Sequence, residues 1–268
     1  MQPFMDHVFD TYSELDPLCI SKSVNVDTDD CVDCCKDSYY GSDTQYKCDN
    51  SKKIYVIRNM ATQIKQVDLA LSQSLREDIC SQNNIKVISL GGGPGTEAIA
   101  LMDILRDYDN DYKLDFDNVD SESSWKIMYR DLTQNFVNRI SNVTLKTRFI
   151  SSDIGSYAKT VTVLYDVAFV SWLFSLINKS QEIENILNVL ESLLRENGYL
   201  VVADRFEPKV VSRISNAIES ADGLVLKEND RQIQWCGVMF PDDLRDKFKV
   251  RLKADSAYWI LQKYSPEF

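Results

Sequence analysis

The sequence predicts an α/β fold: a mostly parallel sheet with helices on both faces and a C-terminal antiparallel hairpin. Three observations predict it. Short β-branched and apolar runs alternate along the chain with segments whose apolar residues recur every three or four positions. A glycine-rich turn joins the first such run to the helix after it. Two strand-like segments end the chain. Alternating strands and helices are typical of a parallel sheet, and an antiparallel pair is common at its edge.

The individual elements follow from apolar spacing and from turn residues. Residues 52–78 form one long predicted helix, with apolar positions at Ile54, Ile57, Ala61, Ile64, Val67, Leu71 and Leu75. We predict strands over 85–90, 112–119, 144–150, 164–170 and 199–203. We predict further helices over 96–108, 125–140, 182–196 and 208–220, with Gly198 as a left-handed cap of the third. The segments "FKVRLKA" and "AYWILQKY" around "DS" predict the hairpin.

The charge is unevenly distributed along the 268 residues. The net charge is −11, and residues 1–50 carry 11 Asp and Glu against 3 Lys. The remainder carries 30 acidic against 27 basic residues and is nearly neutral. This balance excludes a protein that coats nucleic acid by charge alone. We expect an acidic, cysteine-containing extension over residues 1–51 and one domain over residues 52–268.

The sequence has no run of about 18 apolar residues and no basic-then-apolar leader. We therefore expect neither a membrane-spanning helix nor a signal peptide, and a cytoplasmic or nuclear protein. The seven cysteines then favour thiols or metal ligands over disulfides. Cys31-x-x-Cys34 has a zinc-type spacing, but no second such pair accompanies it. Zinc and unligated thiols both stay open for the cysteines of the extension, which are Cys19, Cys31, Cys34, Cys35 and Cys48.

The stretch "VISLGGGPGTEAIAL" holds four of the nine glycines within residues 91–95. A strand that ends where a helix starts leaves unpaired backbone N–H groups. Glycine permits positive φ and lets a ligand approach them closely. A P-loop would need Lys and Ser or Thr after Gly95, where Thr96 and Glu97 stand. A dinucleotide fingerprint would need glycine at position 96. A site for a nucleoside ligand that carries no phosphates would tolerate the acidic Glu97. A tight strand–helix turn that binds no ligand is the alternative.

"VISLGGGPGTE" resembles motif I of class I S-adenosylmethionine-dependent methyltransferases, and the resemblance extends over roughly residues 52–268. It implies a Rossmann-like sheet of seven strands and S-adenosylmethionine as cofactor. Gly91, Gly93 and Gly95 would pass under the methionine part of the cofactor, with Ser89 and Glu97 beside them. The family's ribose-binding acid corresponds to Asp120, with Asp117 as the fallback and helix capping as the alternative role. A carboxylate suits a vicinal diol because it accepts two hydrogen bonds.

The resemblance also implies sites after the third and fourth strands. Asp153 would bond the adenine amino group and Ile154 would pack on the ring, with an Asx turn as the alternative for Asp153. Ser171, Trp172 and Phe174 would flank the transferred methyl group, because ligands of such sheets bind beyond the carboxyl ends of the strands. A purely core role for the two aromatic residues is the alternative. His7, the sole histidine, lies in the acidic segment and is not expected to act as a base.

Several features depart from the family's pattern. Many members have an acid where this chain has Ser89, so the contact to the methionine amino group must be weaker or come from elsewhere. "SWLF" lacks the prolines typical of adenine-N6 and amide methylation, and no cysteine follows the fourth or fifth strand as in 5-methylcytosine enzymes. A faint resemblance to eukaryotic RNA methyltransferases makes RNA the first acceptor hypothesis, reached directly or through a protein partner. Protein and small molecules are the alternatives. A non-catalytic subunit that binds a protein partner through its N-terminal extension is the competing hypothesis.

Overall fold

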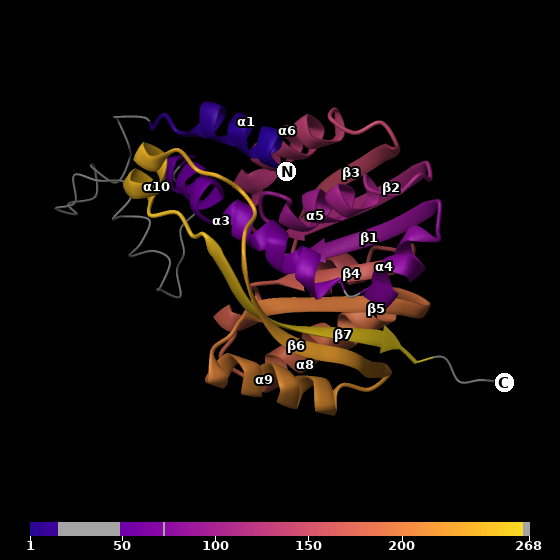
Figure 1. Cartoon of the computed structure of the whole chain (residues 1–268). Helices are drawn as coiled ribbons and strands as arrows, with labels where there is room; N and C mark the ends of the chain where they lie inside the picture. The colour runs from indigo at the N-terminus through magenta and orange to yellow at the C-terminus, as the bar shows by residue number, and fades with distance from the viewer. Residues whose placement is uncertain (16–48, 72, 265–268) are drawn as a thin grey trace. The chain divides into compact units, whose positions relative to one another are not determined.

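A computed structural model describes residues 1–15, 49–71 and 73–264 (Figure 1). Its seven strands form one sheet in the order β3-β2-β1-β4-β5-β7-β6. The strands are β1 (Asn84–Leu90), β2 (Tyr112–Asp120), β3 (Val143–Ser151), β4 (Tyr165–Ser171), β5 (Leu194–Arg205), β6 (Leu224–Trp235) and β7 (Lys253–Lys263). β1 to β5 pair in parallel, and β7 runs antiparallel to β5. The predicted mostly parallel sheet of seven strands is confirmed.

Helices alternate with these strands, as the apolar spacing predicts. They are α1 (Gln2–Tyr12), α3 (Asp49–Ala70), α4 (Gln73–Cys80), α5 (Thr96–Leu105), α6 (Lys126–Val137), α7 (Ile154–Ala158), α8 (Ser180–Leu193), α9 (Pro208–Ser220) and α10 (Asp242–Phe248). Short 3-10 turns, η2 (Ser123–Trp125) and η3 (Phe174–Leu176), follow β2 and β4. The predicted helix over 52–78 is two helices, because α3 ends at Ala70 and α4 begins at Gln73.

The two faces of the sheet are covered by different helices. On one face Ile88, Ala168 and Val202 pack with α7, α8 and α9 in a buried core cluster. On the other face the ring of Tyr129 on α6 lies 5.6 Å from the ring of Phe149 on β3. Parallel register places Ser89, Asn118 and Phe149 on that second face, the face of α6. The β1–α5 turn therefore lies at the carboxyl ends of strands that are buried on both sides.

Two details of the sequence prediction are wrong. Gly198 does not cap α8, because the left-handed residue is Asn197 (φ 60°), inside the strand β5 that starts directly after the helix. "FKVRLKA" does not form a separate strand, since α10 ends at Phe248, Lys249 adopts φ 51°, and β7 begins only at Lys253. β7 instead lies between β5 and β6, the strand before it in the chain, which was not predicted. The antiparallel edge is thus present, but it is not the predicted hairpin.

The described residues form two compact units. One unit comprises residues 1–65 and 235–254, and the other comprises residues 66–234 and 255–268. The first contains α1 and α10, and in it the ring of Phe9 on α1 lies 4.9 Å from the ring of Phe240, which precedes α10. The second contains the strands β1 to β5 and the β1–α5 turn. No helix in the described part of the chain has the length and apolar character needed to cross a membrane.

Candidate functional site

The turn between β1 and α5 is built on three glycines with positive φ. Gly91, Gly93 and Gly95 have φ of 65°, 42° and 92°, a region that L side chains rarely adopt. The Gly91 N–H donates to Val119 O at 2.8 Å, and the Gly95 N–H donates to Gly92 O at 2.8 Å. A Cβ at Gly91 or Gly93 would lie 3.4 Å or more from its neighbours. Backbone conformation, rather than lack of room, therefore requires glycine at these two positions.

Asp120, the predicted ribose-binding acid, lies against this turn. Its Oδ2 accepts a hydrogen bond from the Gly93 N–H at 2.9 Å, and its Oδ1 accepts one from the Glu122 N–H at 2.8 Å. Burial raises the pKa of the Asp120 carboxyl, and these two N–H groups oppose the rise. The structure thus brings the carboxylate at the end of β2 and the glycine turn at the end of β1 together, as the sequence predicts.

Asn118 and Gly92 fit each other closely below the turn. The Asn118 Nδ2 donates to Gly93 O at 3.1 Å. A Cβ at Gly92 would lie 1.9 Å from Asn118 Oδ1 and 2.6 Å from Ser89 Oγ. Gly92 has no positive φ, so it is glycine because the neighbouring strand places an amide against it. Ser89 and Asn118 are also register partners on β1 and β2.

Four buried polar atoms around the turn have no hydrogen-bond partner among the described residues: Ser89 Oγ, Glu97 Oε2, Asn118 Oδ1 and Ser171 Oγ. Glu97 lies in the first turn of α5 and is 2% exposed. Burial raises the pKa of the Glu97 carboxyl to about 7, and its own N–H and the nearby hydroxyls of Ser171 and Ser89 oppose this rise. None of these groups forms a hydrogen bond with Glu97 Oε2. Unsatisfied buried polar groups are uncommon in proteins, so this cluster marks the turn as a functional candidate.

The segment after β4 contains the three predicted catalytic residues in different environments. Ser171 is buried in β4, and Trp172 adopts φ 54° with its N–H donating to Ala203 O at 2.9 Å. A left-handed tryptophan costs about 1–3 kcal/mol and needs support from its surroundings. Phe174 is fully buried in the core cluster, so packing is the role that the structure shows for its ring. Acceptor contact by Ser171 and Trp172 stays a prediction.

Asp204 holds this segment in place and was not singled out by the sequence. It is the last residue but one of β5, is 1% exposed, and its Oδ2 accepts a hydrogen bond from the Ser175 N–H at 2.9 Å. Burial raises the pKa of its carboxyl. The signal was an acidic residue at the end of an apolar strand, "VVAD", the same pattern that identified Asp120. Asn118 was missed because its contact is to a turn more than 20 residues away.

Asp153 and Ile154 lie at the start of α7, beyond β3. Asp153 is exposed and caps this helix, since its Oδ1 accepts the Ser156 N–H at 2.8 Å. The Ser156 hydroxyl and N–H lower the pKa of this carboxyl. Ile154 is 9% exposed and belongs to the core cluster. The structure therefore shows the capping role for Asp153, and adenine contact by either residue stays a prediction.

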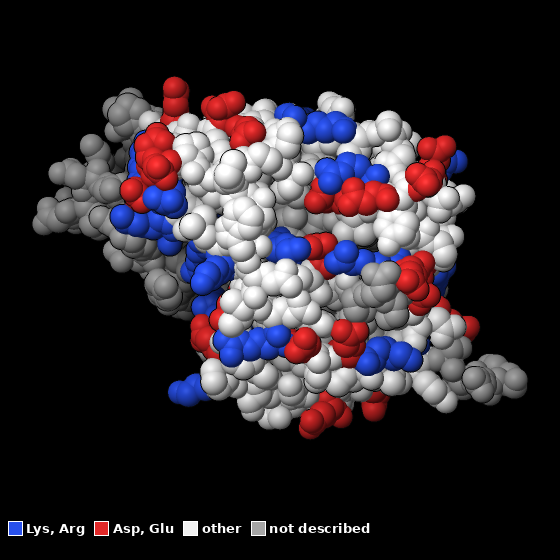
Figure 2. Space-filling model, in the orientation of Figure 1, with Lys and Arg blue, Asp and Glu red and all other residues white. Residues whose placement is uncertain are grey.

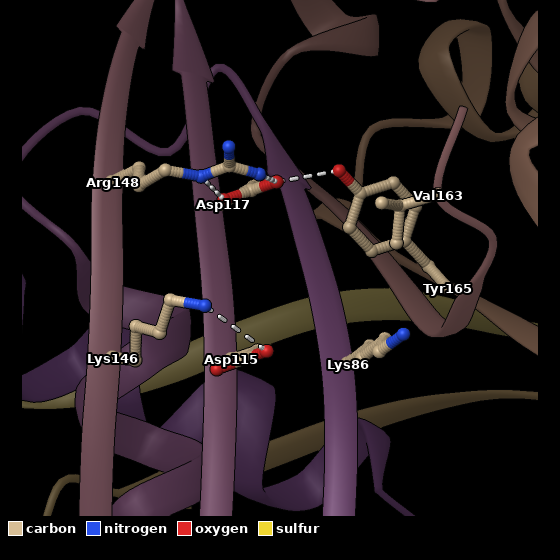
Figure 3. A pocket seen from close by; sticks show the side chains of 7 residues that line it. All are labelled: Lys86, Asp115, Asp117, Lys146, Arg148, Val163 and Tyr165. Atoms are coloured by element: carbon tan, nitrogen blue, oxygen red, sulfur yellow. Dashed lines mark hydrogen bonds and ion pairs between the residues drawn. The ribbon is translucent and has the colours of Figure 1, made fainter. Parts of the chain in front are cut away.

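A charged pocket of about 260 Å³ lies on the α7–α9 face of β1, β2 and β3 (Figure 3). There Asp117 accepts hydrogen bonds from Arg148 Nε at 2.8 Å and Nη2 at 2.5 Å, and from the hydroxyls of Tyr157 at 3.0 Å and Tyr165 at 2.5 Å. Lys146 approaches Asp115 at 3.8 Å. Asp117, the fallback ribose acid, is thus bound internally and lies on the face opposite Asn118. It is not placed to serve the glycine turn.

Other candidate residues lie apart from the turn. The cysteines of the zinc hypothesis, from Cys19 to Cys48, fall outside the described residues. Within the described ranges, no three His, Cys, Asp or Glu side chains are grouped to hold a metal ion. Cys80 and Cys236 are buried free thiols. His7 is on α1, where its Nδ1 lies 3.4 Å from Thr11 Oγ1.

Comparisons with known proteins agree with this architecture. No protein-family model and no curated protein sequence matches the chain. Among solved structures, the plantazolicin methyltransferase BpumL in complex with SAH aligns with a TM-score of 0.52 and 12% identity, over 87% of this chain and 98% of that one. Magnesium protoporphyrin IX methyltransferase (ChlM) from Synechocystis PCC 6803 with bound SAH aligns with a TM-score of 0.51 and 12% identity, over 87% and 93%. The chain therefore has the fold of class I methyltransferases.

Proposed function

We propose that the chain is an S-adenosylmethionine-dependent methyltransferase. The observation that carries the proposal is the Asp120 carboxylate, 2.9 Å from the N–H of Gly93 in a turn built on positive-φ glycines. The methyltransferase fold supports it, because open α/β sheets bind their ligands beyond the carboxyl ends of the strands. A nucleoside with a free ribose diol and no phosphates suits a site with one carboxylate and an acidic helix start.

The residues of the turn fit that cofactor. The three glycines contribute no side chain to the turn, and each Asp120 oxygen has a further lone pair for a ribose hydroxyl. Glu97 and the Ser89 and Ser171 hydroxyls hold unsatisfied acceptors near the turn. An ammonium group of the cofactor's methionine end would satisfy such acceptors. Glu97 and Ser89 are the proposed contacts to that end.

When bound, the cofactor supplies a methyl group that is already activated by its sulfonium centre. The chain's task is then to hold donor and acceptor close and in line. We assign binding to Gly91, Gly93, Gly95 and Asp120, and alignment of the acceptor to Ser171 and Trp172 after β4. Phe174 supports that segment from the core, and Asp204 fixes it through Ser175.

Binding of S-adenosylhomocysteine, measured by isothermal titration calorimetry, tests the proposal. Loss of the two ribose hydrogen bonds predicts that Asp120→Ala weakens binding by roughly 10- to 100-fold. Asp115→Ala is the matched control, since this carboxylate lies on the same strand with its side chain 48% exposed and should leave binding unchanged. If the wild-type chain binds neither S-adenosylhomocysteine nor S-adenosylmethionine, the non-catalytic scaffold hypothesis replaces this one.

RNA is the acceptor that we propose first, on the faint sequence resemblance, with protein and small molecules as alternatives. A tritiated methyl donor incubated with total RNA, total protein and small-molecule extract of the native source separates the three. Label in the RNA fraction that ribonuclease removes is the expected result. Label confined to either other fraction would refute the RNA acceptor while leaving methyl transfer intact.

A further inference from the structure

A groove lies along the outer side of β3, the strand at one edge of the sheet. Among the described strands β3 pairs only with β2. The outer side of an edge strand carries alternate peptide N–H and C=O groups that point away from the sheet. Helix α6 flanks this edge, and together they enclose about 480 Å³. The lining residues are Lys126, Ile127, Tyr129, Arg130, Thr147, Arg148, Phe149 and Ile150.

The groove has an apolar surface that nothing in the described chain covers. Ile127 on α6 is 74% exposed, and Phe149 and Ile150 on β3 are half-buried. Tyr129 lies buried beneath them, bonded to the Thr147 hydroxyl and in contact with the Phe149 ring. An exposed apolar surface beside free peptide groups is the chemistry that accepts an added strand, since backbone hydrogen bonds give affinity and pockets for alternate side chains give specificity.

The rim of the groove is cationic. Lys126, Arg130 and Arg148 line it, and no Asp or Glu is among the lining residues. Arg148 is bound to Asp117, with its side chain still 59% exposed. Lys126 and Arg130 make no ion pair with any residue in the described ranges. A partner with acidic side chains is attracted to these cations as it approaches, and the charge pairs fix its register along β3.

We propose that this β3 groove binds an extended segment of another protein, added as a strand to β3, in which apolar residues alternate with acidic ones. Apolar side chains on the α6 face would meet Ile127 and Phe149, while carboxylates on the opposite face of the added strand would reach Arg148. Lys126 and Arg130, on α6, would attract the acidic segment from the other side of the groove. A peptide is favoured over an RNA strand because the apolar lining and the free peptide groups suit amide backbone and aliphatic side chains. The proposal does not depend on cofactor binding.

Fluorescence anisotropy with the full chain tests the proposal. The probe is a labelled nine-residue peptide of alternating valine and glutamate, which matches the nine residues of β3. We expect saturable binding, at least about tenfold weaker for the same peptide with lysine in place of glutamate. Hydrogen–deuterium exchange should show new protection of β3 amides in the complex, because strand addition occupies backbone groups that side-chain docking alone would leave free.

Two matched variants locate the contact. Ile127→Glu should weaken binding by roughly tenfold or more, because it places a charge in the apolar centre of the groove. Ile233→Glu changes a residue that is 54% exposed on β6, the opposite edge strand, and should leave binding unchanged. Both positions are exposed, and thermal melting confirms that both variants fold.

Four results would overturn the proposal. They are no binding of the glutamate peptide up to about 1 mM, equal binding of the lysine peptide, equal effects of the two variants, and bound peptide without protection of β3. A nine-nucleotide single-stranded RNA that binds in the groove more tightly than the peptide would assign the surface to nucleic acid instead.

Discussion

Single atoms at the β1–α5 turn decide which residues it accepts. Gly95 combines two constraints: its φ is 92°, and a Cβ there would lie 2.7 Å from Tyr129 Cδ2. Gly237 has a φ of 77°, with no heavy atom of the described residues within 4 Å of the position of a Cβ. Comparing Gly95 with Gly237 separates backbone strain from steric overlap, because a side chain at Gly95 meets both and one at Gly237 meets only the strain.

Gly95→Ala is expected to lower the free energy of unfolding by about 2–4 kcal/mol, from left-handed strain and overpacking against Tyr129. Gly237→Ala carries the strain alone and should cost about 1 kcal/mol. Urea denaturation of both variants gives the two values. Equal losses would mean that the ring of Tyr129 moves aside freely.

Glu97 makes stability depend on pH. Its pKa in the folded chain is about 7, above the ordinary value of 4.5, because the carboxyl is buried. The folded state therefore holds a proton that the unfolded state has released, and this contribution to stability is lost as pH rises from 4.5 through 7. The shift corresponds to about 3 kcal/mol.

Glu97→Gln removes this dependence, since the amide stays neutral at every pH. Relative to wild type, the variant should gain stability between pH 5 and pH 8, measured by denaturant unfolding of both proteins at the two pH values. The difference in the free energy of unfolding between variant and wild type reports on Glu97 alone, because the other buried carboxyls are the same in both proteins. A difference that does not change with pH would contradict the raised pKa.

At the scale of elements, Asp117 connects three strands and a helix. Its carboxylate on β2 binds Arg148 on β3, Tyr157 on α7 and Tyr165 at the start of β4. The carboxylate's side chain is 7% exposed, whereas that of Arg148 is 59% exposed. The buried acceptor should therefore matter more than its exposed donor.

Asp117→Ala is expected to destabilise the chain by about 3–5 kcal/mol, because it leaves buried hydroxyls without their acceptor. Arg148→Ala should cost about 1 kcal/mol or less, since water screens the exposed guanidinium. Thermal or urea unfolding of each variant measures the difference. The reverse order would show that the ion pair, rather than the tyrosine bonds, holds the network.

The same scale shows how far the sequence predicts the fold. The buried strands β1, β2 and β4 lie within a residue of their predicted bounds, because local apolar runs define them. The C-terminal pairing was not predictable from local pattern: β7 lies beside β6, a mostly exposed strand that the apolar spacing did not predict, and "FKVRLKA" alternates like a strand although α10 includes its first residue. Within the site, Asp120 followed from a motif, whereas Asn118 depends on a turn that packs against it in three dimensions.

For the whole molecule, charge limits how an acceptor is recruited. The net charge is −11, and on the face shown in Figure 2 lysine and arginine side chains are interspersed with aspartate and glutamate. Long-range electrostatic attraction therefore cannot bring a polyanion such as RNA to the chain. Recognition of an RNA acceptor would depend on local contacts or on a basic partner.

The close fit of Asn118 to Gly92 ties together two positions that are far apart in the sequence. Any side chain at 92 would overlap the amide at 118, where a Cβ comes within 1.9 Å of its oxygen. Engineering of this turn must therefore change these positions together: a side chain at 92 needs a smaller residue at 118 and also at 89, whose hydroxyl would lie 2.6 Å from the same Cβ.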